Sequence, residues 1–205
     1  MHARSPGLVD EKWETGESTL SFCVVGASGD LAKKKILPAL FALYNQGMMP
    51  KQFTIFGYAR SKMTQDEFRE LVKKCVSGMK ASEDKVTYFL SRCFYQPGQY
   101  DAVEDFETLN TLMTEQERSV EKANRIFYLS IPPQIFTAVA QNASRAASSS
   151  HGWTRMIVEK PFGRDTESFK QLSAELYEHL QEEQIYRIDH YLGKELIENL
   201  TVLRF

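Results

Sequence analysis

The chain has 205 residues, of which 42% are hydrophobic and 25% are charged, as in ordinary globular domains. Its 25 basic and 27 acidic residues leave a net charge of −2, so we do not expect the basic surface of a nucleic-acid-binding domain. No apolar run approaches the roughly 20 residues that a membrane span needs, so we do not expect a membrane-spanning segment. Three cysteines without metal-ligand spacing argue against a disulfide scaffold and a zinc module, predict no metal site and favour a reducing compartment.

Short apolar runs alternate with amphipathic stretches along most of the chain. Polar residues 1–18 have no apolar period, and we expect a disordered tail there. The patterns predict strands at residues 20–25, 53–58, 125–131, 155–159 and 184–188, and helices at residues 30–46, 64–76, 82–93, 102–113, 135–147, 166–181 and 192–205. This alternation predicts βαβ units in an α/β fold with a mainly parallel sheet.

Two of the predicted helices carry local signals. Thr64 and Glu67 have the spacing of a capping box at the start of residues 64–76. Pro38 lies inside residues 30–46, where it should kink or break the helix.

A glycine-containing turn joins the first strand to the first helix. Gly26 permits a tight turn, Gly29 permits close backbone approach, and Ala32 lets the helix pack on the strand, as in a Rossmann-type, doubly wound dinucleotide-binding fold. The N–H groups at the start of the helix can hold a phosphate, and the Ser28 hydroxyl can donate to one. The alternative is an ordinary strand-to-helix turn. The cofactor-loop interpretation covers Gly26, Ala27, Ser28, Gly29, Asp30, Leu31 and Ala32.

The end of the second strand indicates which dinucleotide is bound. NAD enzymes usually place a carboxylate there, whereas this strand is followed by Arg60 and Lys62. The planar guanidinium of Arg60 suits a 2′-phosphate, which favours NADP as the coenzyme. The alternative is a solvated arginine at a strand end.

Two later strand ends are also rich in polar residues. One strand ends at Glu159 and is followed by Lys160 and Pro161, a combination shared by several nicotinamide-dependent oxidoreductases. Residues 187–195 contain an imidazole, a phenol and an ammonium group at the exit of the last strand, which together can donate to a phosphate.

These motifs resemble those of the glucose-6-phosphate dehydrogenase family. The resemblance runs in order from about residue 20 to residue 205, through residues 26–35, 56–61, 159–165 and 187–195. Within the family the chain is most similar to the plastid forms of plants and algae. The resemblance implies NADP-dependent oxidation of D-glucose 6-phosphate to 6-phosphogluconolactone. This reaction is the first step of the oxidative pentose phosphate pathway and belongs to carbohydrate (glucose) metabolism. The implied location is the plastid stroma, with the cytoplasm as the alternative.

The same resemblance implies roles for individual residues. The coenzyme loop would extend from Gly26 through Lys33, and Arg60 would bind the 2′-phosphate. Lys160 would lie between nicotinamide and sugar, contacting both coenzyme and substrate in a catalytic position, and Asp189 would orient a catalytic histidine. The 6-phosphate would be held by His190, Tyr191 and Lys194.

The resemblance also implies a domain division and a missing part. Residues 19–190 would form the NADP-binding domain, and residues 191–205 would begin a truncated domain for substrate and oligomer contacts. We expect an N-terminal fragment without activity of its own, because no histidine here matches the catalytic base, while the full-length form would be a homo-oligomer. The alternative function is a non-catalytic NADP-binding module or regulatory paralogue. Another Glu-Lys-Pro sugar dehydrogenase is disfavoured by residues 189–194.

Plastid forms of the family carry a regulatory cysteine pair near residues 72–93. Cys75 could be one member, but Ser82 stands about where the other would be. Three unpaired thiols are the alternative.

Overall fold

The computed structural model describes residues 16–159 and 166–188. The helix expected at residues 192–205 and the expected domain boundary after residue 190 lie outside these ranges. The tail expected over residues 1–18 is described only at its end, where Ser18 already belongs to the first strand.

The described residues form a six-stranded sheet in the order β3-β2-β1-β4-β5-β6, and every neighbouring pair is parallel. This order places the switch in winding direction between β1 and β4, as the doubly wound α/β prediction requires. The strands are β1 (Ser18–Val25), β2 (Gln52–Ala59), β3 (Cys93–Pro97), β4 (Lys122–Leu129), β5 (Thr154–Glu159) and β6 (Ile185–Ile188).

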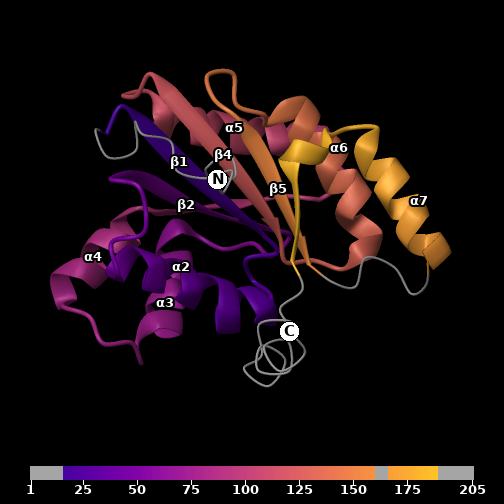
Figure 1. Cartoon of the computed structure of the whole chain (residues 1–205). Helices are drawn as coiled ribbons and strands as arrows, with labels where there is room; N and C mark the ends of the chain where they lie inside the picture. The colour runs from indigo at the N-terminus through magenta and orange to yellow at the C-terminus, as the bar shows by residue number, and fades with distance from the viewer. Residues whose placement is uncertain (1–15, 160–165, 189–205) are drawn as a thin grey trace, which may run out of the picture.

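Helices cover both faces of the sheet, three longer helices on each side (Figure 1). The first group is α2 (Leu37–Asn45), α3 (Gln65–Val76) and α4 (Glu83–Ser91), and the second is α5 (Val103–Glu117), α6 (Phe136–Ala146) and α7 (Thr166–Tyr177). Short helical turns occur at η1 (Ala32–Ile36), η2 (Pro133–Ile135) and η3 (Glu182–Gln184).

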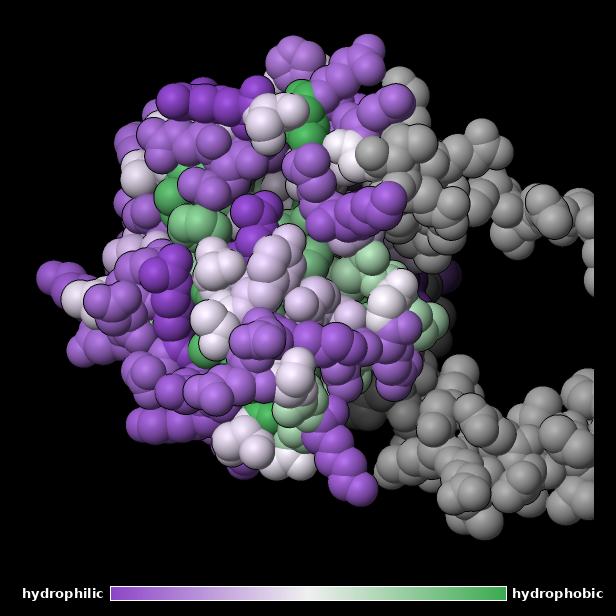
Figure 2. Space-filling model, turned by 90° about the vertical axis from the view of Figure 1, so that its left-hand side faces the viewer, coloured by the Kyte–Doolittle hydropathy of each residue, from purple (hydrophilic) through white to green (hydrophobic). Residues whose placement is uncertain are grey.

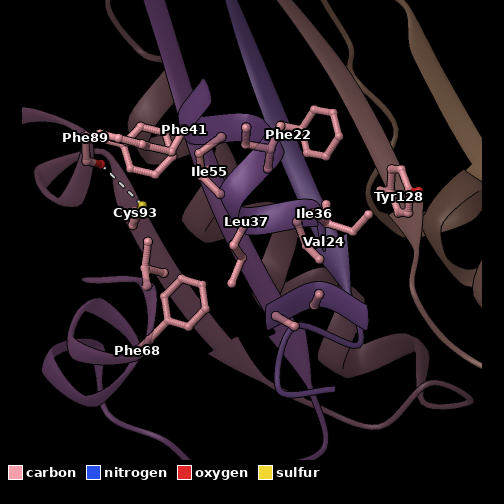
Figure 3. Packing of buried hydrophobic residues seen from close by; sticks show 14 of the residues in the cluster. Phe22, Val24, Ile36, Leu37, Phe41, Ile55, Phe68, Phe89, Cys93 and Tyr128 are labelled. Atoms are coloured by element: carbon pink, nitrogen blue, oxygen red, sulfur yellow. Dashed lines mark hydrogen bonds between the residues drawn. The ribbon is translucent and has the colours of Figure 1, made fainter. Parts of the chain in front are cut away.

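Each face of the sheet has its own apolar core. Val24 and Ile55 pack with Leu37 and Phe41 of α2 and with Phe89 of α4 on one side (Figure 3). On the other side, the strand residues Cys23, Val25 and Phe127 pack with Phe136 of α6 and Leu176 of α7. Alternation along each strand therefore divides the apolar residues between the two helical layers.

The first helix changes its winding just before Pro38, where the sequence predicts a break. Residues Ala32–Ile36 form a π-helix, and the Leu37 N–H donates to the Ala32 carbonyl five residues back. Pro38 follows in the first turn of α2. Because proline lacks an N–H and crowds the preceding turn, the wider π turn accommodates it without interrupting the helix.

The capping box predicted at Thr64 is confirmed. The Glu67 N–H donates to Thr64 Oγ1 at 3.2 Å, and the Thr64 N–H donates to Glu67 Oε2 at 2.7 Å. The hydrogen bond that the Glu67 carboxylate accepts from the Thr64 N–H lowers the pKa of this carboxyl.

The prediction of a helix through Cys93 is wrong at its end. The helix α4 stops at Ser91, and Cys93 starts β3, a strand that the sequence pattern did not reveal. This strand has five residues and ends at Pro97, so it carries too little alternation to be distinguished from the preceding helix.

The outer edge of β3 is covered by side chains of α3. Gln65 Nε2 donates to the Cys93 carbonyl at 2.7 Å, and the Tyr95 N–H donates to Gln65 Oε1 at 3.1 Å. Arg69 Nε donates to the same Cys93 carbonyl at 3.3 Å. The Gln65 amide therefore pairs with β3 as a neighbouring strand would.

A buried ion pair joins β4 to α5. Arg125 Nη2 lies 2.6 Å from Glu117 Oε2, and the two side chains are 3% and 7% exposed. Arg125 Nη1 donates to Asn110 Oδ1 and to the Ala147 carbonyl, while Ser21 Oγ donates to Glu117 Oε1. The network thus connects β1, β4, α5 and the end of α6.

The backbone turn after β1 requires glycine at residue 26. Gly26 has a φ of +87°, and a Cβ at this position would overlap the Ser130 carbonyl and the Ile131 side chain. The Ser130 N–H donates to the Val25 carbonyl at 2.8 Å, and the Gly26 N–H donates to the Tyr58 carbonyl at 2.7 Å. The ends of β1, β2 and β4 are therefore held together at this point.

The outer surface is mainly hydrophilic on the side where α4 lies. Figure 2 shows only small, separate hydrophobic patches there. Within the residues that the structure describes, no helix combines the length and apolar character needed to cross a membrane.

We predict that Arg125→Met destabilises the protein by about 3–5 kcal/mol, because it leaves the Glu117 carboxylate buried without its cation. Urea denaturation followed by circular dichroism measures this loss. The double variant Arg125→Met/Glu117→Leu should be less destabilised than the single variant. A double variant at least as unstable as Arg125→Met would contradict this account of the ion pair.

We also predict that Gly26→Ala lowers the free energy of unfolding far more than Gly47→Ala. Gly47 has a similar φ of +73°, but a Cβ there would meet nothing within 4 Å. The control therefore measures backbone strain alone, about 1 kcal/mol, whereas Gly26→Ala also displaces the Ser130 backbone. Equal losses in the two variants, measured by the same urea titration, would show that the contact with Ser130 is unimportant.

Candidate functional site: a dinucleotide-binding edge

The loop after β1 presents free N–H groups at the carboxyl edge of the sheet. The Gly29 N–H donates to the Gly26 carbonyl at 2.9 Å, and the Lys33 N–H to the Gly29 carbonyl at 3.1 Å. Between these bonds, the N–H groups of Asp30 and Leu31 have no backbone acceptor among the described residues. They lie at the positive end of the helix dipole, so this loop can bind a phosphate as the sequence predicts.

The loop side chains add one hydroxyl pair and an exposed ion pair. Ser61 Oγ, which follows β2, donates to Ser28 Oγ at 2.9 Å. Asp30 pairs with Lys34 at 2.9 Å, and this hydrogen bond lowers the pKa of the Asp30 carboxyl. Lys33 is half-buried, whereas Lys34 and Lys35 are exposed, as expected for a basic triplet spread around a helix.

Arg60 lies directly after β2 and has no carboxylate partner in the described part of the chain. Its guanidinium carbon lies 5.4 Å from the centre of the Tyr100 ring. A pocket opens beside it, lined also by Lys62, Glu67 and Asp105. The two carboxylates of this pocket already accept backbone hydrogen bonds, from Thr64 at 2.7 Å and from Gln99 at 2.7 Å. The pocket therefore combines two cations with two carboxylates that are oriented by the backbone, and no described ion pair joins Arg60 or Lys62 to either carboxylate, so both cations remain able to bind a phosphate.

Glu159 ends β5 at the same edge of the sheet. It is 8% exposed and accepts a hydrogen bond from the hydroxyl of Tyr128 in the neighbouring strand β4. Burial, this hydrogen bond and the carboxylate charge together raise the pKa of the Tyr128 phenol. The hydroxyl therefore remains a donor that fixes the Glu159 carboxylate.

Several predicted site residues lie outside the described ranges. These are Lys160, Asp189, His190, Tyr191 and Lys194, so their roles stay predictions. Arg187, at the start of the same motif, is described, and its guanidinium binds Glu182 at 2.9 Å and the Tyr177 hydroxyl at 2.9 Å. These contacts tie β6 to the end of α7.

The three cysteines are unpaired thiols. Burial raises the pKa of Cys93 to about 12 and also raises that of Cys75. Ser82 caps α4 by accepting a hydrogen bond from the Lys85 N–H at 3.4 Å. Across residues 16–159 and 166–188, no group of three His, Cys, Asp or Glu residues could hold a metal ion.

The structure adds residues that sequence reasoning missed. Ser61 and Tyr100 contact the predicted site residues Ser28 and Arg60. Ser61 could have been suspected from its place next to Arg60, but Tyr100 is 40 positions away and carries no local signal. Together, the free N–H groups, Arg60 and Tyr100 provide a phosphate-binding loop, a cation that can bind a second phosphate, and an aromatic ring along one edge.

Comparison with known proteins shows the family. Residues 23–199 match the family model described as "Glucose-6-phosphate dehydrogenase, NAD binding domain". The chain is 55% identical over 202 residues to the chloroplastic glucose-6-phosphate 1-dehydrogenase 1 of Arabidopsis thaliana, covering 97% of this chain and 35% of that protein. It is 46% identical to the cytoplasmic isoform 6 of the same plant, covering 98% of this chain and 40% of that one.

A solved structure agrees in sequence and in fold. It is titled glucose-6-phosphate dehydrogenase in complex with its substrate glucose-6-phosphate. It superposes with a TM-score of 0.82 at 41% identity, covering 92% of this chain and 40% of that one. The chain thus spans between a third and two fifths of the length of these relatives. Since the family model covers most of the sequence, the chain belongs to the glucose-6-phosphate dehydrogenase family and carries its dinucleotide-binding domain.

Proposed function

We propose that this chain is the NADP-binding part of a glucose-6-phosphate dehydrogenase, which oxidises D-glucose 6-phosphate to 6-phosphogluconolactone. The observation that supports NADP over NAD most directly is Arg60. It stands at the strand end where NAD enzymes carry a carboxylate, and no described carboxylate neutralises it. A 2′-phosphate supplies the missing negative charge.

The coenzyme would lie along the carboxyl edge, with its central pyrophosphate and its 2′-phosphate at separate sites. The N–H groups of Asp30 and Leu31 would receive the pyrophosphate, and Arg60 the 2′-phosphate. Tyr100, already in contact with the Arg60 guanidinium, would hold this side chain in position. When bound, NADP accepts the hydride that leaves C1 of the sugar.

The sugar end of the reaction would use residues outside the described ranges. We propose that His190, Tyr191 and Lys194 bind the 6-phosphate, that Lys160 contacts both reactants, and that Asp189 orients a catalytic histidine. A neutral imidazole takes the C1 hydroxyl proton as the hydride leaves, and a paired carboxylate stabilises the resulting imidazolium. The described histidines do not fit this role, because His151 is exposed next to Ser150 and His179 follows α7.

We further propose that the protein acts in the plastid stroma and as a homo-oligomer. The compartment is supported by relatives described as chloroplastic, among them the Arabidopsis thaliana protein at 55% identity. The alternative location is the cytoplasm, which is favoured by the similarity to the cytoplasmic isoform 6 at 46% identity.

We predict that Arg60→Ala weakens NADP(H) binding by about 1.5–3 kcal/mol, or roughly one to two decades, because one charge-assisted contact to the 2′-phosphate is lost. NAD(H) binding should change little. Fluorescence titration of both reduced coenzymes measures the difference. The control is Arg118→Ala, which removes an exposed arginine that pairs only weakly with Glu115 at 3.9 Å. Equal wild-type affinities for the two coenzymes would refute the proposed preference.

We also predict that Lys194→Ala, in a protein that includes the catalytic histidine, raises KM for glucose 6-phosphate with little change in kcat. The 6-phosphate does not react, so its contacts contribute equally to ground-state and transition-state binding. Steady-state assays of NADPH formation separate the two constants. A collapse of kcat at constant KM would place Lys194 in the chemical step. Absence of glucose 6-phosphate-dependent turnover in the unsubstituted protein would favour a non-catalytic NADP-binding module.

A further inference from the structure

A tyrosine of β3 holds the backbone on both sides of Arg60. The Tyr95 hydroxyl donates to the Ser61 carbonyl at 2.6 Å and lies 3.4 Å from the Ala59 carbonyl. These are the carbonyls of the two residues that flank Arg60. No other donor in the described part of the chain reaches the Ser61 carbonyl, so its position depends on Tyr95.

The Tyr95 side chain is itself fixed. It is buried, and its ring centre lies 5.1 Å from that of Phe68 in α3. Gly57, in the neighbouring strand β2, leaves room for both rings, because a Cβ there would lie 2.5 Å from the Phe68 ring and 3.0 Å from the Tyr95 ring. The Tyr95 N–H donates to the Gln65 side chain at 3.1 Å. A hydroxyl on a ring so constrained can hold the backbone that it binds.

The hydroxyl also keeps its hydrogen. Burial, and after it the nearby Tyr100, raises the pKa of the Tyr95 phenol to about 12. A neutral phenol has one hydrogen to donate, and the Ser61 carbonyl is the closer of the two acceptors. The bond to Ser61 is therefore present throughout the neutral pH range.

Other hydrogen bonds hold the same short segment. Ser61 Oγ donates to Ser28 Oγ at 2.9 Å, and the Gly98 N–H donates to the Ala59 carbonyl at 3.0 Å. Together with the Tyr95 bond they fix the backbone of residues 59–61, whereas no described carboxylate pairs with the Arg60 guanidinium. The backbone of Arg60 is thus held in place while its cation remains available to a ligand.

Tyr95 itself stands behind the site. It is not among the described residues that line the pocket beside Arg60, so it can influence a ligand there only through the segment that it holds. Ordering a loose backbone segment costs conformational entropy, and a ligand that needs this order must supply it on binding. A segment that is already ordered removes this cost. Only a ligand that uses Arg60 gains from the effect.

We propose that Tyr95 is a positioning residue for coenzyme selection, whose hydroxyl holds the Arg60 segment where the guanidinium meets a 2′-phosphate. This inference rests on the proposed coenzyme function and assigns part of the NADP preference to a side chain that does not touch the coenzyme. NADH carries the same pyrophosphate and nicotinamide as NADPH but has no 2′-phosphate. Its binding therefore does not use the anchored cation.

The experiment compares NADPH with NADH by isothermal titration calorimetry on the complete 205-residue chain. Tyr95→Phe keeps the ring and removes only the hydroxyl. It should weaken NADPH binding roughly three- to tenfold, the effect of one hydrogen bond, and leave the NADH affinity unchanged. A merely structural role of the hydroxyl would lower the melting temperature without changing the ratio of the two affinities.

A double-mutant cycle tests whether Tyr95 acts through Arg60. The Arg60→Ala variant has no guanidinium to position, so the addition of Tyr95→Phe should leave its NADPH affinity unchanged. A further three- to tenfold loss in this background would show that Tyr95 acts by another route, and it would overturn the inference.

Tyr177 offers a matched control. Its hydroxyl donates to Glu182 at 2.5 Å and accepts from Arg187 of β6 at 2.9 Å, at the opposite edge of the sheet from β3. Tyr177→Phe therefore removes a hydrogen-bonded hydroxyl far along the sheet from Arg60. This variant should bind both coenzymes as the unsubstituted chain does.

The outcomes distinguish this inference from the function on which it rests. If the unsubstituted chain binds neither coenzyme, or binds both equally, the proposed NADP function fails, and this inference fails with it. If NADPH is preferred but Tyr95→Phe leaves the ratio of affinities unchanged, only the inference is overturned.

Melting temperatures show whether each variant folds. If Tyr95→Phe does not fold, Gly57→Ala decides, because its Cβ would crowd the Tyr95 ring and shift the hydroxyl without removing it. A selective loss of NADPH affinity in Gly57→Ala supports the inference, and an unchanged ratio overturns it.

Discussion

The contact between the loop after β1 and the end of β4 constrains everything at the functional edge. Gly26 must take a positive φ, and it must have no side chain, because the Ser130 backbone occupies that space. The hydrogen bonds from Gly26 to Tyr58 and from Ser130 to Val25 hold the ends of three strands together there. The free N–H groups, Arg60 and Glu159 are positioned relative to one another only because this junction is closed.

Polar groups have different roles at the two edges of the sheet. Toward the amino edge, Arg125 and Glu117 are fully engaged with each other and with groups from neighbouring elements. This network stabilises the packing of α5 against β1 and β4. At the carboxyl edge, the N–H groups of Asp30 and Leu31 have no backbone acceptor among the described residues, and the cation of Arg60 contacts the Tyr100 ring but no described carboxylate. A phosphorylated ligand would provide the hydrogen-bond acceptors and the negative charge that these groups lack.

Local patterns predicted the elements whose signals are local. The turn after β1, the capping box of Thr64 and the irregularity near Pro38 each depend on a few adjacent residues, and the structure has the first two as predicted and a π turn in place of a break before Pro38. The strand β3 was missed, because five residues beside a helix end carry little periodicity. The partners of Arg125, the contact of Tyr100 with Arg60 and the pairing of Tyr128 with Glu159 join distant positions. They follow from strand register, which a single sequence does not reveal.

The side-chain amide of Gln65 has a consequence for how copies of the chain can meet. An unprotected edge strand offers its backbone as a template on which another extended chain can add, the usual beginning of domain exchange and fibrous aggregation. At β3 the Cys93 carbonyl and the Tyr95 N–H are already bound to Gln65, in the positions that an incoming strand would use. Because α3 supplies this cover, the sheet cannot be extended at β3 until that helix moves away. Helix α3 therefore acts as a guard against intermolecular strand addition as well as a layer of the core.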